Sequence, residues 1–393
     1  MKQPQKKTSS KPRVAYLIPL LRGQGGWPTG ALGIIHSLAG SVEPVLIVSR
    51  ADEAAARELF PAYEIHTLPE LQPMVAGSLR VAAHMAPTFW ALRRMPALHV
   101  DLVHSLEMFP IGWVGDALAA RERTPHVLTA YGTFGVVWRR WPLIARAYAG
   151  VLQRAACVCP MSSGTADKMR AHFGIALKET PVEVVLHGSD FAKRIPHRVA
   201  EEKSFPHTPL VLSVGSLKPR KGYHVSLRAF GEFQKSHPQA RYVVAGGGLG
   251  TAYHRDLLAL AARENIRNVE YPGLLTWEQL DPLYRGASML VMTSQEEGGH
   301  FEGFVFVFLE AGAYGLPVIG TRTGGIPDAV NDGHTGFLLD ADDVAGITCA
   351  MNRLADDGHL ARQMGLSGRA RAEELTWDRY AAQQMKIYRR FLA

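Results

Sequence analysis

The sequence has few cysteines and no long apolar run, and these two absences exclude several classes of protein. Only three of its 393 residues are Cys, at positions 157, 159 and 349, so a disulfide-stapled scaffold is excluded. No apolar stretch approaches the roughly 18 residues of a membrane-spanning helix. The apolar segment 14–21 is short and runs into a Gly-rich loop, unlike a secretion signal. We therefore expect a cytoplasmic protein in which Cys157 and Cys159 pack in a core.

Acidic residues are in deficit only in the first half of the chain. The formal net charge is +7. Residues 1–195 contain 22 Lys and Arg against 14 Asp and Glu, whereas residues 196–393 contain 21 against 22. This asymmetry favours an anionic partner for the first half of the chain. The partner could be nucleic acid, an anionic lipid or an anionic small molecule. A basic surface that merely keeps the protein soluble is the alternative.

What the sequence does contain is apolar runs of strand length that alternate with segments of helix length. Residues 1–12 are polar and basic and are predicted to form a disordered tail. After them, the alternation continues to about residue 190, breaks in the charged segment 191–207, and restarts over 208–375. Such alternation is typical of a parallel sheet with helices on both faces. The sequence therefore predicts an α/β protein with two doubly wound, Rossmann-like domains (13–190 and 208–375), a linker, and a ligand site in the cleft between the domains.

The predicted strands lie at 13–20, 43–48, 63–68, 100–104, 125–130, 156–160, 182–186, 209–214, 241–245, 268–272, 288–293, 316–320 and 335–339. One apolar segment is excluded from this set. Phe304–Leu309 has the highest β propensity in the chain. It runs into the sequence LEAGAYG, however, and a glycine in that position marks the end of a helix. We therefore expect a buried helix over 304–314.

Three glycine-containing turns follow predicted strands. Residues 215–222 (GSLKPRKG) add Arg220 and Lys221 to the free N–H groups at the start of a helix, which suits a diphosphate. Residues 246–250 (GGGLG) mimic part of a dinucleotide fingerprint but lack the acidic residue expected about 20 positions later. Gly25 and Gly26 let a ligand approach the backbone. Taken alone, each turn could equally be an ordinary connection.

Glu302 and Glu310 form the sharpest pair of candidate residues. Carboxylates accept hydrogen bonds from vicinal hydroxyls, so the pair suits a sugar and a sugar nucleotide. Eight residues at about 100° each would place the two side chains some 80° apart on one helix. Glu302 is therefore expected in the loop before the helix that carries Glu310. Two unrelated acids are the alternative for this spacing alone.

Around these residues the chain resembles the retaining glycosyltransferases of family 4, which have the GT-B fold. The strongest segment is 301–311 (FEGFVFVFLEA), close to the family's FEGFG…LEA signature with its E-x7-E spacing. The resemblance continues through 315–318 (GLPV), 323–328 (TGGIPD) and 332–336 (DGHTG). Looser matches in the first half are 101–104 (DLVH), 129–132 (TAYG), 162–165 (SSGT) and 187–190 (HGSD).

The resemblance implies roles for the candidate residues. Glu310 would bind the donor ribose, Glu302 would contact the donor sugar, and Arg220 with Lys221 would hold the diphosphate. No cofactor or metal is implied, because these cations and helix dipoles would neutralise the leaving group. The final helix, 376–391, would cross back onto the first domain. The implied site comprises catalytic Glu302 and Tyr131, with donor-binding Gly25, Gly26, Gly215, Ser216, Arg220, Lys221, Gly246, Gly248, Leu275 (whose backbone would meet the base), Gly303, Phe304, Val305, Phe306 and Glu310.

Three residues depart from the family pattern. Ser216 stands where Arg is frequent, and Arg220 would supply that charge. Val305 replaces the second Gly of FEGFG and crowds a loop expected to approach the donor. Tyr131 stands where His is common, and a phenol with an ordinary pKa near 10 cannot become a cation. A separate motif, Asp340-Ala-Asp342, resembles a metal-binding DxD, but we expect these acids to cap the following helix.

The sequence thus predicts a metal-independent enzyme of hexosyltransferase type. It would move a sugar from a nucleoside diphosphate sugar to an acceptor hydroxyl with retention, in cell-surface glycan or glycolipid synthesis. The partners are a nucleotide sugar and a glycan or lipid-linked acceptor, not nucleic acid. A catalytically silent subunit that binds a glycan or a protein is the alternative. A sugar-nucleotide epimerase would leave the LEA and GGIPD runs unexplained.

Two aromatic, basic segments of the first half suggest a membrane surface. Trp138-Arg-Arg-Trp141 opens the segment 142–155, in which Ile144, Tyr148, Val151 and Leu152 recur at helical spacing beside Arg139, Arg140, Arg146 and Arg154. The second segment is 89–94 (FWALRR). Trp and Arg together suit a bilayer interface. The alternative is that the apolar stripe faces the core and that the arginines are solvated.

Overall fold

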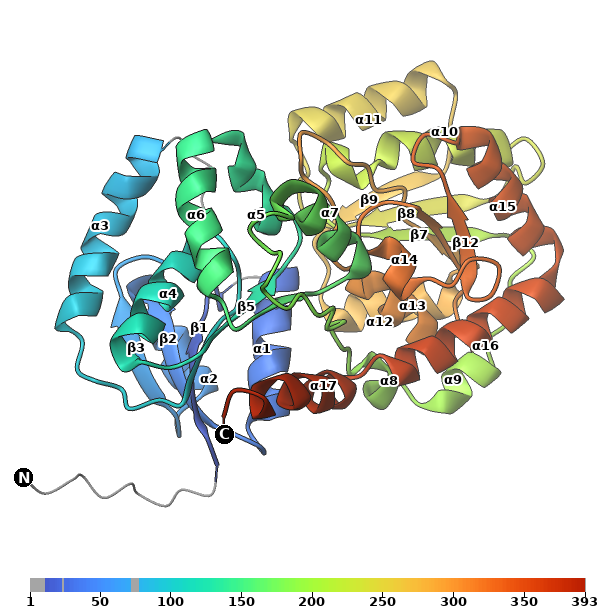
Figure 1. Cartoon of the computed structure of the whole chain (residues 1–393). Helices are drawn as coiled ribbons and strands as arrows, with labels where there is room; N and C mark the ends of the chain where they lie inside the picture. The colour runs from blue at the N-terminus through green and yellow to red at the C-terminus, as the bar shows by residue number, and fades with distance from the viewer. Residues whose placement is uncertain (1–10, 23–24, 72–77, 393) are drawn as a thin grey trace, which may run out of the picture. The chain divides into compact units, whose positions relative to one another are not determined.

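The chain divides into two α/β units in the computed structural model, which describes residues 11–22, 25–71 and 78–392 (Figure 1). The first unit comprises residues 1–161, 165–186 and 377–393, and the second comprises 162–164 and 187–376. Most of the predicted tail, residues 1–10, lies outside the described residues.

The first unit is built on six parallel strands in the order β3-β2-β1-β4-β5-β6. They are β1 (Arg13–Leu17), β2 (Glu43–Ser49), β3 (Glu64–Leu68), β4 (Leu102–Ser105), β5 (His126–Ala130) and β6 (Cys157–Pro160). This is the Rossmann order, in which the winding of the sheet reverses between β1 and β4.

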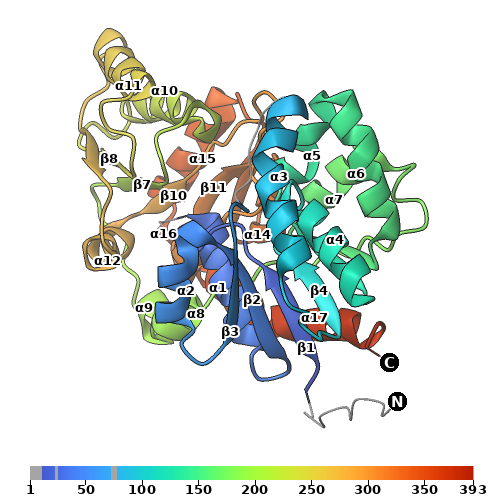
Figure 2. The ribbon, with the colours of Figure 1, turned by 90° about the vertical axis from the view of Figure 1, so that its left-hand side faces the viewer.

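Helices cover both faces of this sheet, with α1 and α17 on one face and α3, α4 and α6 on the other (Figure 2). The helices are α1 (Gly26–Leu38), α2 (Glu53–Leu59), α3 (Ser78–Arg94), α4 (Ile111–Glu122), α5 (Thr133–Val136), α6 (Pro142–Arg154), α7 (Ser163–Phe173) and α17 (Trp377–Arg389). Short 3₁₀ turns lie at Arg50–Asp52 and Val137–Arg140.

The second unit repeats the same order, β12-β11-β10-β7-β8-β9, when its strands are counted from β7. They are β7 (Leu210–Val214), β8 (Arg241–Ala245), β9 (Val269–Gly273), β10 (Met289–Val291), β11 (Val318–Thr321) and β12 (Gly336–Leu339). The predicted fold class, two doubly wound Rossmann-like units, is therefore confirmed.

In Figure 1, α10 and α11 lie above the second sheet, and α12, α13 and α16 lie below it. The helices of this unit are α8 (Phe191–Arg194), α9 (His197–Glu201), α10 (Tyr223–Phe233), α11 (Ala252–Arg263), α12 (Trp277–Gly286), α13 (Phe306–Ala313), α14 (Ile326–Ala329), α15 (Val344–Asp356) and α16 (Gly358–Glu374), with a 3₁₀ turn at Pro219–Lys221. None of the helices among the described residues is long and apolar enough to cross a membrane.

The predicted helix over 304–314 is confirmed as α13. Its residues are apolar on nearly every side, as expected of a helix that is surrounded by protein. α13 crosses α16 at very short range, because a Cβ atom on Gly312 would lie 2.4 Å from the carbonyl oxygen of Gly368. Glycine at this crossing fixes the position of α13, which carries Glu310.

The predicted strand 182–186 is wrong. Only Val182 forms a bridge with β6, at Val158. The segment still runs beside β6 and donates from Glu183 N to Val158 O over 3.0 Å. Val185 N likewise donates to Pro160 O (2.9 Å), but Pro160 has no N–H with which to donate back to Glu183 O. Two N–H groups of the segment thus pair with β6, but the missing donor at Pro160 keeps the segment from forming a regular strand.

The segment 191–207, predicted as a linker, contains two short helices and belongs to the second unit. Buried Arg369 holds it by donating to the carbonyls of Ala192 (2.7 Å) and Ile195 (2.8 Å). Lys203 donates to two carbonyls at the end of α12. Charged side chains bind this segment to the unit where apolar periodicity is lacking.

The final helix, α17, belongs to the first unit. The ring of Trp377 lies against α1 at Gly33, where an added Cβ would be 2.0 Å from the indole. Farther along, the hydroxyl of Tyr388 lies 2.5 Å from His104 Nδ1 of β4. The chain therefore returns to the first sheet after completing the second unit.

The apolar stripe of α6 faces the core, as the alternative predicted. Ile144, Tyr148, Val151 and Leu152 are all buried. Trp138 is also buried and stacks on Phe173, with ring centroids 4.1 Å apart. The side chains of Arg139 and Arg140 lie outside the described residues.

Two smaller expectations also concern the first unit. Arg154, predicted beside the apolar stripe of α6, pairs with Asp116 of α4 (2.6 Å). Cys157 and Cys159 are buried, with their sulfur atoms 3.9 Å apart, which confirms the core interpretation of this pair.

Candidate active site

The strongest candidate residues of the second unit meet where its sheet reverses direction. Arg220 and Lys221 lie in the turn after β7, and Glu302 lies in the loop after β10, the neighbouring strand. In open α/β sheets, ligands bind outside the carboxyl ends of the strands at this reversal.

Two cations converge on one carboxylate oxygen at this point. Lys221 Nζ lies 2.9 Å from Glu302 Oε1, and Arg220 Nη1 contacts the same oxygen. The hydroxyl of Ser294 donates to it over 3.5 Å. Glu302 is only 6% exposed. Burial alone would raise the pKa of Glu302, but Lys221 and Arg220 outweigh burial and the pKa is lowered. The ionised cluster keeps one positive charge in excess, which suits an anionic ligand.

Glycine brings the cationic turn against the end of β10. Gly222 has a φ of +69°, and an added Cβ would lie 1.8 Å from the carbonyl oxygen of Thr293. The turns after β7 and β8 also contact each other, since a Cβ on Gly246 would lie 2.0 Å from Gly215 O. Gly246 N donates in turn to the carbonyl of Gly273, the last residue of β9 (2.8 Å). These turns form one backbone-lined edge.

Other predicted residues lie along the same edge. Gly248, with a φ of +111°, follows β8 beside Leu217. Ser216 is exposed, and Leu275 is half-buried between β9 and α12. The residues of the β7 and β8 turns therefore lie together in space.

The loop before α13 is held by the turn after β11. Gly325 N donates to Glu302 O (2.8 Å), and an added Cβ on Gly325 would lie 1.9 Å from Gly303 O. Val305 has a φ of −114°, which any L residue adopts, and its side chain is buried, as is that of Phe304. Phe306 is half-buried and begins α13. The backbone at Val305 therefore does not require the glycine of the family signature.

Glu310 lies within α13, whereas Glu302 precedes the helix, as their spacing predicted. Tyr284 OH donates to Glu310 Oε2 (2.7 Å). Burial raises the pKa of Glu310, and the hydrogen bond from Tyr284 opposes the rise. Tyr284 stacks on Tyr314, with ring centroids 5.0 Å apart. A rigid aromatic pair thus orients this carboxyl group.

Gly25, Gly26 and Tyr131 belong to the first unit, at the carboxyl ends of its strands. Gly25 precedes α1 with a φ of +142°, and both glycines are exposed. Tyr131, after β5, is buried. Burial, followed by the nearby charge of Glu107, raises the pKa of Tyr131 well above 10. Its side chain is therefore a neutral phenol at physiological pH.

Sequence reasoning missed Glu107, which lies two residues after β4. It is completely buried, and Tyr131 N donates to its Oε1 over 3.4 Å. Its position just beyond a predicted strand, at the edge where Gly25 and Tyr131 were placed, is the signal that could have found it.

Comparison with known proteins connects this geometry to one family. The model described as Glycosyltransferase Family 4 matches residues 25–193, and that described as Glycosyl transferases group 1 matches residues 197–371. The D-inositol 3-phosphate glycosyltransferase of Streptomyces avermitilis is 30% identical over 93% of this chain and 82% of its own length. The chain belongs to glycosyltransferase family 4.

Other relatives of this glycosyltransferase match over shorter stretches. A GDP-mannose-dependent alpha-(1-6)-phosphatidylinositol monomannoside mannosyltransferase from Mycolicibacterium smegmatis is 29% identical over 66% of this chain and 68% of its own. The D-inositol 3-phosphate glycosyltransferase of Streptomyces scabiei is 37% identical, but the match spans only 45% of this chain and 40% of that relative.

Solved structures share the GT-B fold of this glycosyltransferase. Sucrose-phosphate synthase from Thermosynechococcus elongatus superposes with a TM-score of 0.76 at 22% identity, covering 97% of this chain and 99% of that one. Anabaena HepE in complex with UDP-glucose gives a TM-score of 0.69 at 17% identity, covering 96% and 99%. At these identities the likeness shows the fold alone.

The DxD-like motif of this glycosyltransferase lies just before α15. The helix is capped by Asp343, whose side chain accepts from Gly346 N (2.8 Å), not by Asp340 or Asp342. The predicted cap is therefore wrong by one residue, because α15 begins at Val344. In the described part of the chain, no group of three or more His, Cys, Asp or Glu residues is arranged to hold a metal ion.

Proposed function

We propose that this protein is a retaining glycosyltransferase that moves a sugar from a nucleoside diphosphate sugar to an acceptor hydroxyl. The observation that carries the proposal is the pairing of Lys221 and Arg220 with one oxygen of buried Glu302. Such a cluster offers cations to a diphosphate and a carboxylate to sugar hydroxyls at one place. The names of relatives add support, since one uses GDP-mannose and a structural neighbour was solved with UDP-glucose.

In the proposed reaction, the bond between the anomeric carbon and the diphosphate oxygen breaks while the acceptor oxygen bonds to the same face of that carbon. The acceptor proton passes to the departing diphosphate oxygen. Arg220 and Lys221 stabilise the charge that develops on the leaving group, with no divalent metal required. Glu310 binds the ribose and Glu302 the sugar. In the first unit, Gly25 and Gly26 are the proposed donor-binding residues and Tyr131 is the proposed catalytic residue.

A coupled assay for nucleoside diphosphate release, run with UDP- and GDP-sugars and a phosphorylated polyol acceptor, tests this proposal. We expect release that depends on the acceptor and persists with EDTA, and a product whose anomeric configuration matches the donor by NMR. An inverted product contradicts the retaining mechanism, and loss of activity with EDTA contradicts metal independence.

The second candidate is a catalytically silent subunit, and the buried, neutral Tyr131 is the observation that favours it. Such a subunit would bind the nucleotide without turnover. A thermal-shift screen separates the two, because a ligand at 100 times its dissociation constant stabilises the native state by about 2.7 kcal/mol. Stabilisation without any diphosphate release across the acceptors tested favours the silent subunit.

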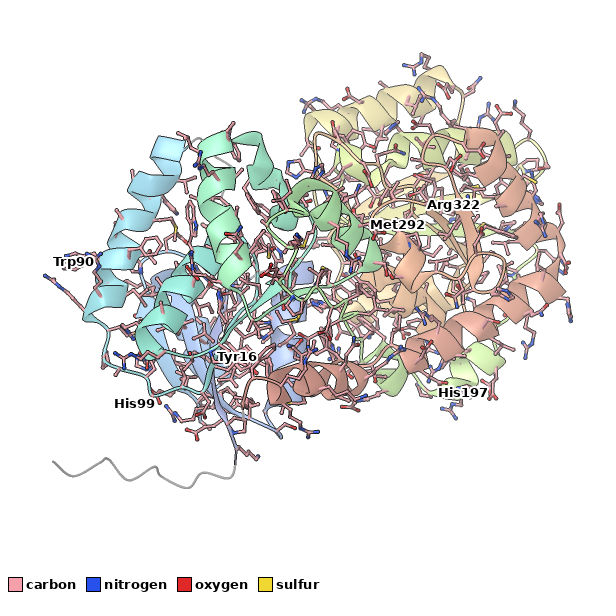
Figure 3. All side chains as sticks on the ribbon, in the orientation of Figure 1. Tyr16, Trp90, His99, His197, Met292 and Arg322 are labelled. Atoms are coloured by element: carbon pink, nitrogen blue, oxygen red, sulfur yellow. The ribbon has the colours of Figure 1, made fainter. Side chains whose placement is uncertain are left out.

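The acceptor is proposed to be lipid-linked, in glycolipid or cell-surface glycan synthesis, with the protein peripheral to the membrane. The relative that is named for a phosphatidylinositol monomannoside acceptor supports this class. Trp90 of α3 is 57% exposed and points away from its unit (Figure 3). The Arg94 guanidinium lies 3.3 Å from the centre of its ring. An indole beside a cation suits the headgroup region of an anionic bilayer.

Sedimentation with anionic and neutral liposomes at low ionic strength tests the membrane proposal. We expect binding to the anionic vesicles only, and weaker binding after Trp90→Ala. The matched control is Leu258→Ala, an exposed apolar residue of the second unit. Protein that stays in the supernatant with both vesicles contradicts the membrane proposal and favours a soluble acceptor.

A further inference from the structure

Glu107 occupies the position in the first unit that Glu302, the carboxylate of the cationic cluster formed with Arg220 and Lys221, occupies in the second. It follows β4, the strand next to β1 at the reversal of the first sheet. Its side chain is 0% exposed. Among the residues that the structure describes, no cation pairs with it. A buried acid without a counter-charge is costly, which raises the question of what it does.

Three N–H groups from three different segments point at this carboxyl group. Oε1 accepts from Met108 N (2.8 Å) and Tyr131 N (3.4 Å), and Oε2 accepts from the indole Nε1 of Trp27 (3.1 Å). Trp27 directly follows the exposed Gly25 and Gly26. We call Glu107 and its three donors the Glu107 network. It connects the first turn of α1, next to Gly25, to the loop that carries Tyr131.

The network fits an ionised carboxylate and not a neutral one. All three partners are donors, so a carboxylate accepts from each, whereas a protonated acid brings a fourth hydrogen into the same space. Burial raises the pKa of Glu107 to about 8, although the hydrogen bonds from Met108, Tyr131 and Trp27 oppose the rise. The network therefore changes its hydrogen bonding close to neutral pH.

The other titratable groups that face Glu107 have pKa values far from that of Glu107. They are Tyr131, after β5, and Tyr148, on α6. Burial raises the pKa of both well above 10. Tyr148 donates to the carbonyl of Met108, and α1 contributes only the neutral indole. A titration near pH 8 in this region is therefore that of Glu107.

We propose that Glu107 is a positioning residue for glycosyl transfer, which holds the start of α1 at Gly25–Trp27 and the backbone of Tyr131 in their working arrangement when its carboxyl group is ionised. The inference rests on the proposed function, in which the first unit contributes these residues to the transfer step. Glu107 acts through Trp27 and Tyr131 and does not itself touch the substrate.

The test compares the wild type, Glu107→Gln and the control Glu58→Gln between pH 6 and 9.5, using kcat/KM for the acceptor. Glu58 is an exposed acid of the same unit. We expect the wild-type value to rise about ten-fold through pH 8. Glu107→Gln is neutral at every pH, so its profile should stay flat at the wild-type pH 6 level. Glu58→Gln should keep the wild-type profile.

Calorimetry with the nucleoside diphosphate separates this inference from the function on which it rests. We expect Glu107→Gln to bind the nucleotide within two-fold of the wild type, because the cationic cluster belongs to the other unit. Absence of nucleotide binding by the wild type would overturn the proposed function itself. If the wild type binds the nucleotide and transfers the sugar, but its kcat/KM does not change with pH, the positioning role is overturned. This result does not require that Glu107→Gln folds. A Glu107→Gln profile that still rises through pH 8 also overturns it.

Discussion

Glu302 is ionised although it is buried, because Lys221 and Arg220 share one of its oxygens. Its pKa is lower in the folded chain than in the unfolded one. The ion cluster therefore contributes stability above the unfolded pKa near 4.5, and that stability is lost as pH falls through the folded pKa. The sequence suggested that Arg220 and Lys221 lie in an open cleft. In such a cleft the two cations would be solvated and would not contribute to the stability of the fold.

Replacing Arg220 and Lys221 together by Ala should therefore destabilise the fold as well as abolish nucleotide binding. A buried charge left without its partner costs about 3–5 kcal/mol. Adding Glu302→Gln should recover most of that stability without restoring nucleotide binding. Urea unfolding and calorimetry measure the two effects. If the double variant is as stable as the wild type, the prediction is contradicted. Glu302 would then become hydrated or protonated at no cost in the free energy of unfolding.

Glu310→Ala should weaken binding of the nucleoside diphosphate by one to two decades. The ribose would lose a charged acceptor, and such a hydrogen bond contributes about 1.5–3 kcal/mol. Tyr284→Phe is the matched control, because it removes the hydrogen-bond donor at Glu310 Oε2 and leaves the carboxyl group in place. Calorimetry on both folded variants decides. Equal affinity in the wild type and Glu310→Ala rejects the ribose assignment.

At the level of elements, the crossing of α13 and α16 sets where Glu310 lies. The helices approach through glycine, so a methyl group has no room at Gly312. Gly312→Ala should cost about 1–3 kcal/mol through overpacking. Gly358→Ala, at the start of α16, meets nothing within 4 Å and should be neutral. Guanidinium unfolding of both variants checks the difference, and equal midpoints would contradict a close crossing.

Periodicity predicted most elements but not the interactions that modify them. Phe304–Leu309 has the composition of a strand, yet a glycine stop identified it as a helix. Residues 182–186 have the composition of a strand too, but Pro160 of the neighbouring strand β6 has no N–H to complete the ladder with them. The same limit applies to the candidate site. The E-x7-E spacing placed Glu302 and Glu310, whereas Glu107 and the burial of Glu302 depend on folded neighbours that no local pattern encodes.

At the level of the whole molecule, the two units share one strand order but draw on the sequence differently. The second is nearly continuous in sequence, whereas the first needs α17 from the far end of the chain. Trp377→Ala should open a cavity beside Gly33 and cost about 3–5 kcal/mol in that unit. Hydrogen exchange should become faster in β1 and β4 and stay unchanged in β7 and β8. Faster exchange in both sheets would contradict independent stabilisation of the two units.

The position of α17 also has a consequence for biosynthesis. When Leu186 leaves the ribosome, the first unit still lacks the helix that covers α1 and supplies the hydrogen-bond partner of His104 Nδ1. Residues 187–376 must be translated first, which takes roughly 10–40 s at about 5–20 residues per second. During that interval the nascent first unit exposes the apolar face that α17 later covers. The second unit is therefore fully synthesised before the first unit is. We expect ribosome-stalled chains that end before residue 377 to bind chaperones through the first unit, and chains that extend past residue 393 by a linker to release them.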